Sequence, residues 1–180
     1  MNSSALPAQT TEKLRQIKLL LLDVDGILTD GKLYFGNQGE ELKAFNILDG
    51  QGIRLLQDSG VKVGIVTGRK SELVARRARD LDIAFVIQGS KNKRESVTKI
   101  AQEANIALDN IAFMGDDYPD LIAMQAVGLS FTVTNAHEEI KQRVDWQSQY
   151  RGGDGAVREA CDIIMKAQGT YEDALNKFLQ

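Results

Sequence analysis

The chain has 180 residues, of which 43% are hydrophobic and 26% charged, a composition that excludes disorder over most of its length. Its 22 basic and 25 acidic residues give a net charge of −3, which argues against general nucleic-acid binding and against a polybasic membrane anchor. The single cysteine, Cys161, excludes an intrachain disulfide, and the single histidine, His137, argues against a multi-histidine metal site, so metal or acid–base chemistry falls to carboxylates.

Strands and helices are predicted to alternate along the chain. The continuous apolar run 17–24 ends in carboxylates, as a buried parallel strand does. Segment 32–46 places a Gly/Asn-rich turn, 36–39, between two short apolar runs and predicts a β-hairpin. The remaining predicted elements are strands at 61–66, 84–87, 111–114 and 131–133, helices at 50–59, 71–81, 93–104, 119–127 and 156–168, and a short tail helix from 171.

This alternation predicts an α/β fold, a three-layer doubly wound parallel sheet with an inserted β-hairpin and no cap domain. We expect a polar N-terminal extension over 1–16, one domain over 17–169 and a tail over 170–180. Asn135 with Glu138 resembles a helix capping box, and the glycine-rich segment 151–155 is expected to be a flexible loop.

Nothing in the sequence predicts a membrane segment. The first apolar run is too short to cross a bilayer, and the first residues are polar without a basic cluster. Together with the scarcity of cysteine, this favours a cytoplasmic location.

Polar residues follow the predicted strands where functional groups of such sheets collect. Asp23, Asp25 and Gly26 follow the first strand, Thr67 ends the second, and residues 115–117 follow the fourth. Carboxylates brought this close repel one another, and a hard divalent cation with oxygen ligands, Mg²⁺, removes the conflict. With hydroxyl, ammonium and backbone N–H donors nearby, such a site suits a phosphoryl group.

The chain resembles the haloacid dehalogenase superfamily of phosphotransferases. The superfamily's four motifs occur in order: Asp-x-Asp-Gly at 23–26, a strand-end threonine at Thr67, a single lysine at Lys93, and Gly-Asp-Asp followed by a further aspartate at 115–120. Each motif alone is weak, whereas four in order at predicted strand ends indicate the superfamily and its Rossmann-like fold.

Three longer segments, 23–31, 41–46 and 151–159, resemble the 3-deoxy-D-manno-octulosonate 8-phosphate phosphatases, a capless branch used in lipopolysaccharide sugar synthesis. This resemblance covers about residues 17–169. It implies a sugar-acid phosphate substrate, Mg²⁺ in each site and a homotetramer with the hairpins at its centre. We expect a neighbouring subunit to complete each open site, with segment 151–155 as one candidate for closing it.

The family also implies roles for the motif residues. Asp23 is the implied nucleophile, which forms an aspartyl-phosphate, and Asp25 is the implied acid and then base. The implied metal ligands are Asp23, the Asp25 carbonyl and Asp116.

Four further motif residues are implied to act around the phosphate. Thr67 and Lys93 hold its oxygens, and Asp117 and Asp120 orient Lys93 or metal-bound water.

The implied sugar-binding residues suit a substrate with a carboxylate as well as a phosphate. Besides Asp25 and Lys93 they are Asn46, Ile47, Leu48, Asp49, Gly50, Arg54, Gly68, Arg69 and Arg77. The family commonly has arginine where this chain has Leu48, so we expect the acid group to be bound more weakly or by other groups. Arg54 could instead pair with Asp58, and Arg77 could belong to a solvated helix face.

Other functions are compatible with parts of the pattern. A nine-carbon, sialic-acid-type 9-phosphate is the alternative substrate. A signalling receiver domain also combines acidic residues, Thr, Lys and Mg²⁺, but its acidic pair comes first in the chain, whereas Asp116 and Asp117 come late. An inactive scaffold is disfavoured because every catalytic position is filled.

Overall fold

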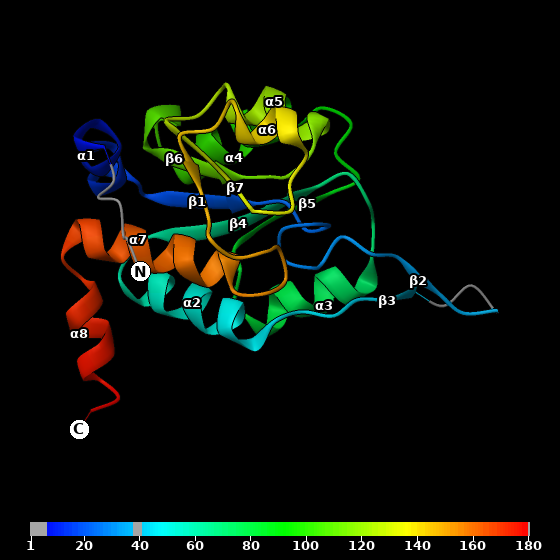
Figure 1. Cartoon of the computed structure of the whole chain (residues 1–180), viewed down its shortest axis with the longest axis horizontal. Helices are drawn as coiled ribbons and strands as arrows, with labels where there is room; N and C mark the ends of the chain where they lie inside the picture. Colours follow the sequence, from blue (N-terminus) through cyan, green and yellow to red (C-terminus); the bar gives the residue numbers. More distant parts are fainter. Residues whose placement is uncertain (1–6, 38–40, 180) are drawn as a thin grey trace.

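The computed structural model describes residues 7–37 and 41–179, which form an α/β fold around one sheet (Figure 1). Its six strands pair in the order β5-β4-β1-β6-β7-β8, and every pair is parallel. The strands are β1 Leu19–Leu22, β4 Lys62–Thr67, β5 Phe85–Gln88, β6 Ile111–Met114, β7 Leu129–Thr132 and β8 Trp146–Gln147. The predicted fold class is confirmed.

Helices cover both faces of the sheet. The helices are α1 Ala8–Gln16, α2 Ile47–Asp58, α3 Glu72–Asp80, α4 Lys93–Ala104, α5 Tyr118–Met124, α6 Glu138–Lys141, α7 Ala156–Gln168 and α8 Tyr171–Asn176, with a 3-10 turn at Leu108–Asn110. Figure 1 shows α2, α3 and α7 on one side of the sheet and α4 and α5 on the other. Among the described residues, no helix is both long enough and apolar enough to span a lipid bilayer.

Several elements differ from the sequence prediction. Helix α1 lies within the expected polar extension and buries Leu14. Strand β8 was not predicted, and its Trp146 packs edge-on against Phe131, with ring centroids 5.2 Å apart. Helix α2 begins earlier than expected because the Asn46 side chain accepts a hydrogen bond from Leu48 N and caps it.

The predicted capping box at Asn135 is wrong. The Asn135 side chain accepts instead from Gly152 N, 2.8 Å away in the loop before α7. Helix α6 is capped by His137, whose Nδ1 accepts from Glu139 N. A tertiary hydrogen bond has therefore displaced the local one.

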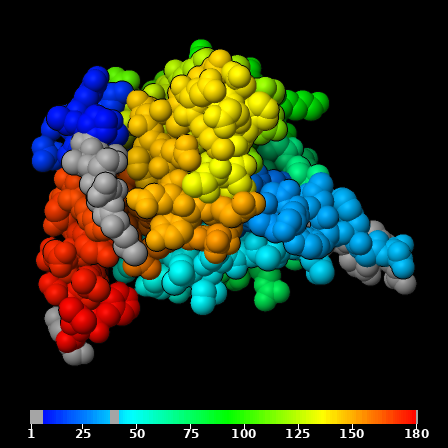
Figure 2. Space-filling model, in the orientation of Figure 1, coloured from blue at the N-terminus to red at the C-terminus, as the bar shows by residue number. Residues whose placement is uncertain are grey.

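The inserted hairpin consists of β2, Tyr34–Phe35, and β3, Glu41–Leu42, which pair antiparallel. Residues 38–40 of the predicted turn lie outside the described part of the chain. The hairpin projects from the body at the end opposite the termini (Figures 1 and 2). Its Phe35 and Leu42 are 67% and 68% exposed, and the described residues between β1 and α2 contain no cap domain.

The sheet places the site by its strand ends. Strand β1 consists of leucines with no exposed surface, so the chain passes through the core and emerges at Asp23. Because β4 and β6 run parallel to β1 on either side, Thr67 and Gly115 emerge at the same edge.

Candidate active site

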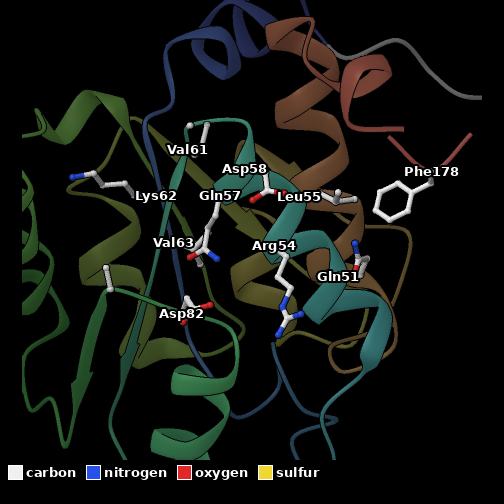
Figure 3. A pocket seen from close by; sticks show the side chains of 12 residues that line it. Gln51, Arg54, Leu55, Gln57, Asp58, Val61, Lys62, Val63, Asp82 and Phe178 are labelled. Atoms are coloured by element: carbon white, nitrogen blue, oxygen red, sulfur yellow. The ribbon is translucent and has the colours of Figure 1, made fainter. Parts of the chain in front are cut away.

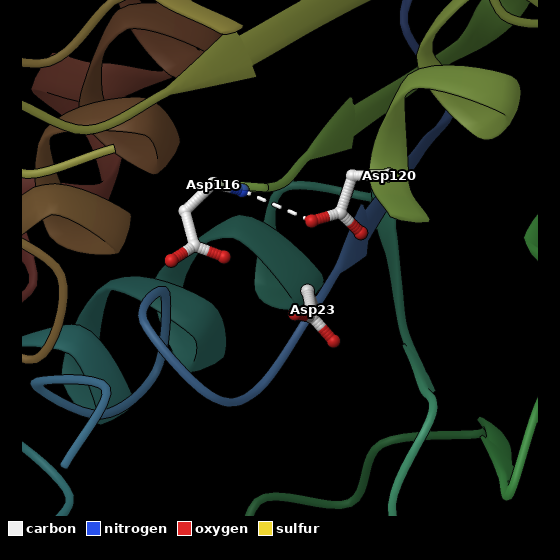
Figure 4. Close-up of side chains that lie close together, drawn as sticks. All are labelled: Asp23, Asp116 and Asp120. Carbon is white, nitrogen blue, oxygen red and sulfur yellow. Dashed lines mark hydrogen bonds between the residues drawn. The ribbon is translucent and has the colours of Figure 1, made fainter. Parts of the chain in front are cut away.

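Three aspartates gather at this edge, as the strand-end argument predicts (Figure 4). Asp23 follows β1, Asp116 follows β6, and Asp120 lies in the first turn of α5. One carboxylate oxygen from each lies within 4.8 Å of the others. Asp23 and Asp120 are buried, so their mutual repulsion is poorly screened by water.

Lys93 supplies a buried positive charge to this cluster. It opens α4, which the Asn92 side chain caps. Its Nζ lies 2.5 Å from Asp120 Oδ1 and 2.9 Å from Asp23 Oδ1. Burial alone would lower the pKa of Lys93, but the charges of Asp23 and Asp120 raise it above its ordinary value, so the ammonium stays charged.

Two of the carboxyl groups hold their protons unusually tightly. Burial, followed by repulsion from Asp120, raises the pKa of Asp23 to about 6, although Lys93 opposes the shift. Burial, with repulsion from Asp120, Asp23 and Asp117, raises the pKa of Asp116 to about 7. One lysine therefore does not neutralise the cluster, and a further cation would.

Asp120 serves to hold the other groups in place. Its Oδ1 accepts from Lys93, while its Oδ2 accepts from Asp116 N at 3.0 Å and from Asp117 N at 3.3 Å. Asp117 is exposed, and its carboxylate accepts from Tyr118 N as the cap of α5. A methyl group on Gly115 would stand 2.4 Å from the Asp120 carboxyl carbon, so this motif requires glycine there.

The residues present fit a hard divalent cation. Asp23 Oδ1 is buried and has no hydrogen bond of good geometry among the described residues, despite the nearby Lys93. With both oxygens of Asp120 occupied by donors, Asp23 and Asp116 are the carboxylates of the cluster best placed to bind a metal. Oxygen ligands of this kind suit Mg²⁺.

Asp25 lies outside the cluster. Its Oδ1 forms an ion pair with Lys43 Nζ, and its Oδ2 lies 3.7 Å from Arg69 Nε. Lys43 belongs to the family-like segment 41–46, but the sequence predicted no role for it. The available signal was a lysine between two apolar residues, Leu42 and Ala44, directly after a hairpin strand.

The loop at 151–155 is not the flexible segment expected from its glycines. Gly153 N donates to Ile27 O at 2.9 Å, and Asn46 Nδ2 donates to Gly153 O at 3.3 Å. A methyl group on Gly152 would stand 1.7 Å from Gly26 O. The small residues therefore allow a close approach to the Asp23–Gly26 turn of the same chain.

Some of the expected sugar-binding residues lie together beside the hairpin. Arg77 donates to Asn46 O at 3.1 Å and lies over the Phe45 ring, 5.7 Å from its centroid. A methyl group on Gly50 would stand 2.3 Å from an Arg77 nitrogen. Arg77 thus bridges α3 to the start of α2 rather than lying on a fully solvated face.

Asp49 faces away from this group. It is 1% exposed, and its Oδ1 accepts from Arg158 N, 2.8 Å away in the first turn of α7. Burial raises the pKa of Asp49, although backbone hydrogen bonds from the start of α7 lower it. At the same helix end, Ile47 is exposed and Leu48 lines a cleft beside Trp146 and Tyr150.

The structure does not bring Arg54 to the acidic cluster either. Arg54 donates a hydrogen bond to Asp80 O at 2.6 Å. Asp80 is the last residue of α3, at the opposite end of this helix from the loop that joins it to β4. Arg54 lines a separate pocket with Asp58 and Phe178 (Figure 3). The hydrogen bond to Asp80 replaces the pairing of Arg54 with Asp58 that the sequence also allowed.

The second predicted strand end is where the sequence placed it. Thr67 is buried at the end of β4, and Gly68 is exposed beside it.

Comparison with known proteins places this geometry in a family. The sequence profile of the haloacid dehalogenase-like hydrolases matches residues 81–159. The chain is 46% identical over 167 residues to the 3-deoxy-D-manno-octulosonate 8-phosphate phosphatase of Escherichia coli K12, covering 93% of this chain and 89% of that protein. The chain belongs to the 3-deoxy-D-manno-octulosonate 8-phosphate phosphatase family. The resemblance inferred from the motifs is thereby confirmed.

Solved structures of related proteins agree with this family assignment. A hypothetical protein from Xanthomonas campestris superposes with a TM-score of 0.94 at 44% identity, covering 98% of this chain and 96% of that one. A family member from Moraxella catarrhalis, solved with magnesium, phosphate and 3-deoxy-D-manno-octulosonate (KDO), superposes with a TM-score of 0.91 at 39% identity. That alignment covers 93% of this chain and 97% of the Moraxella chain.

Proposed function

We propose that this protein is a Mg²⁺-dependent phosphatase that converts KDO 8-phosphate and water to KDO and phosphate, in lipopolysaccharide biosynthesis. The observation that carries the proposal is the position of Asp23, a buried carboxylate between Asp116 and Lys93 at the end of β1. The E. coli relative carries that activity in its name, and the Moraxella relative was solved with the corresponding metal and products.

The proposed reaction has two halves. An Asp23 oxygen attacks phosphorus, the bond from phosphorus to the sugar oxygen breaks, and Asp25 gives its proton to that oxygen. Water then attacks the aspartyl-phosphate, Asp25 takes a proton from this water, and phosphate leaves with Asp23 restored. The two halves replace one difficult hydrolysis with two easier displacements.

The remaining groups are proposed to bind the metal ion and the phosphate oxygens and to balance their charges. Asp23, the Asp25 carbonyl and Asp116 are the proposed ligands of Mg²⁺, which when bound neutralises phosphate charge. Lys93 and Thr67 hold phosphate oxygens. Asp120 fixes Lys93 through its 2.5 Å hydrogen bond. Asp117 supports this arrangement from the start of α5, where it caps the helix.

The sugar acid is proposed to bind beside the hairpin. Arg69 and Arg77 offer cations for its carboxylate, with Asn46, Gly50 and Gly68 around them. Leu48 favours a second candidate, a nine-carbon sugar acid 9-phosphate, because the arginine common in the family is missing at this position. Ile47, Asp49 and Arg54 contribute in this chain only if subunit packing or substrate binding rearranges them.

The test is phosphate release from a panel of sugar phosphates, with and without Mg²⁺. We expect KDO 8-phosphate to have the highest kcat/KM, and no release in excess chelator. Preference for the nine-carbon 9-phosphate would transfer the assignment to the second candidate. No turnover of any sugar-acid phosphate would contradict the proposal.

The homotetramer and the cytoplasmic location stay predictions. Membership of the phosphatase family removes the alternative of a signalling receiver domain.

A further inference from the structure

We propose that Lys43 is a positioning residue, through which the hairpin holds the catalytic acid Asp25 for proton transfer. The inference rests on the proposed phosphatase function and assigns a role within it to a residue outside the four superfamily motifs. It starts from the ion pair between Lys43 Nζ and Asp25 Oδ1.

The Lys43 side chain is held inside the protein. It is only 2% exposed, whereas the Asp25 side chain is 22% exposed. An ammonium in such a place requires an acceptor, and Asp25 Oδ1 provides one both when Asp25 is ionised and when its proton is on Oδ2. Because the lysine is the more enclosed partner, it fixes the position of the acid at the open edge of the site.

A second cation shares Asp25 but differs in its surroundings. Arg69 Nε lies 3.7 Å from Asp25 Oδ2, and the Arg69 side chain is 44% exposed. A guanidinium exposed to this degree is accessible to the carboxylate of an incoming sugar acid. The enclosed Lys43 then remains to hold Asp25 while the substrate is bound.

The position of Lys43 in the chain links its contact with Asp25 to the hairpin. Lys43 directly follows Leu42, the last residue of β3. Leu42 is 68% exposed on a two-stranded ribbon, a structure that is marginal without a partner surface. Whatever fixes the hairpin therefore also fixes Lys43, and through it the carboxyl group that protonates the leaving oxygen.

The variant Lys43→Met tests this role, because methionine keeps much of the side-chain volume and removes the charge. We expect kcat for KDO 8-phosphate to fall roughly 10–100-fold with KM within about twofold. Lys32→Met is the matched control on the same hairpin, since Lys32 is exposed and pairs with Asp30. This control should retain kcat.

Leaving-group dependence separates positioning of the acid from a general structural effect. The nitrophenolate of p-nitrophenyl phosphate leaves as a stable anion and needs no proton from Asp25. The pre-steady-state burst of nitrophenolate therefore reports the attack of Asp23 on phosphorus, before the aspartyl-phosphate is hydrolysed. We expect Lys43→Met to leave the burst rate within about threefold of wild type. Arg69→Met should instead raise KM for the sugar acid.

A double-mutant cycle keeps the inference falsifiable if the single variant is less stable. In an Asp25→Asn background, Lys43→Met should cause no further loss of kcat, because Lys43 acts through the removed acid. Additive losses of kcat, or a fall in the p-nitrophenyl phosphate burst rate as large as the fall in kcat for KDO 8-phosphate, would overturn the proposal. Inactive wild-type protein would instead contradict the phosphatase assignment, and the two failures are therefore distinguishable.

Discussion

The carboxylate of Asp116 rests against the Cα of Gly26, so that a methyl group at residue 26 would stand 1.9 Å from Asp116 Oδ2. Gly26 also has a φ of +90°, a backbone conformation that other residues adopt only with strain. The glycine of the first motif thus leaves room for the carboxylate of the last one, and the two motifs form a single site.

Gly26→Ala is expected to abolish phosphate release and the thermal stabilisation by Mg²⁺, because the methyl group displaces Asp116. Gly60→Ala is the matched control: Gly60 has a φ of +97°, but nothing lies within 4 Å of its added methyl group. It should lose only about 1–2 kcal/mol of unfolding free energy and keep its activity. Calorimetry with and without Mg²⁺ measures both effects, and an active Gly26→Ala would contradict the close approach.

Asp23→Asn is expected to abolish turnover while preserving the fold, because a neutral amide is a far poorer nucleophile and metal ligand. The melting temperature without metal should stay equal or rise, since one charge leaves a self-repelling cluster. Asp58→Asn makes the same change from carboxylate to amide at an exposed position and serves as the control for that change. Phosphate release by Asp23→Asn near the wild-type rate would refute the nucleophile assignment.

Excess EDTA is expected to stop activity and added Mg²⁺ to restore it, with Ca²⁺ a poor substitute. Ca²⁺ takes more ligands at longer distances and lets Asp23 place both oxygens on the metal, away from phosphorus. Steady-state assays with each cation after chelation measure this effect. Full activity in excess chelator would exclude the metal role.

The stability of chelated protein is expected to fall as pH rises from about 4 to about 7, because the pKa of Asp23 is raised to about 6 and that of Asp116 to about 7. In this window the folded protein holds protons that the unfolded chain, with pKa values near 3.8, has released. The stabilising contribution is complete below the unfolded pKa and lost above the folded values.

Thermal melts between about pH 4.5 and pH 7.5 measure this dependence. Asp116→Asn removes one of the two groups and should show a smaller fall in melting temperature than wild type. Mg²⁺ should restore stability at the upper pH, where it replaces the lost protons. An identical fall in the variant and the wild type would contradict the assignment to the cluster.

Replacing Phe35 and Leu42 by Asp is expected to dissociate the predicted homotetramer and to lower substrate affinity at the same time. Both side chains are exposed on a hairpin that projects from the body, and burial between subunits is the simplest way to cover them. Light scattering at assay concentration measures the assembly. A fully active wild-type monomer would refute this mechanism and leave the phosphatase chemistry intact.

Local sequence patterns determined much of this fold. The predicted bounds of α4, β6 and α7 match the structure residue for residue, because each is set by neighbouring residues: an Asn cap, a short apolar run, and a glycine at either end. The strand-end position of Asp23 likewise follows from the pattern around it, since parallel strands align their carboxyl ends.

Contacts between distant segments decided the rest, because no local pattern encodes which surfaces meet. Asp49 turns to the start of α7, 109 residues away, and is buried there instead of facing a substrate. The glycines at 152–153 pack on the Gly26 turn rather than moving freely. Lys43 reaches Asp25 because the chain folds back from the hairpin, so the sequence supplied the charges of the site and tertiary packing decided which of them pair.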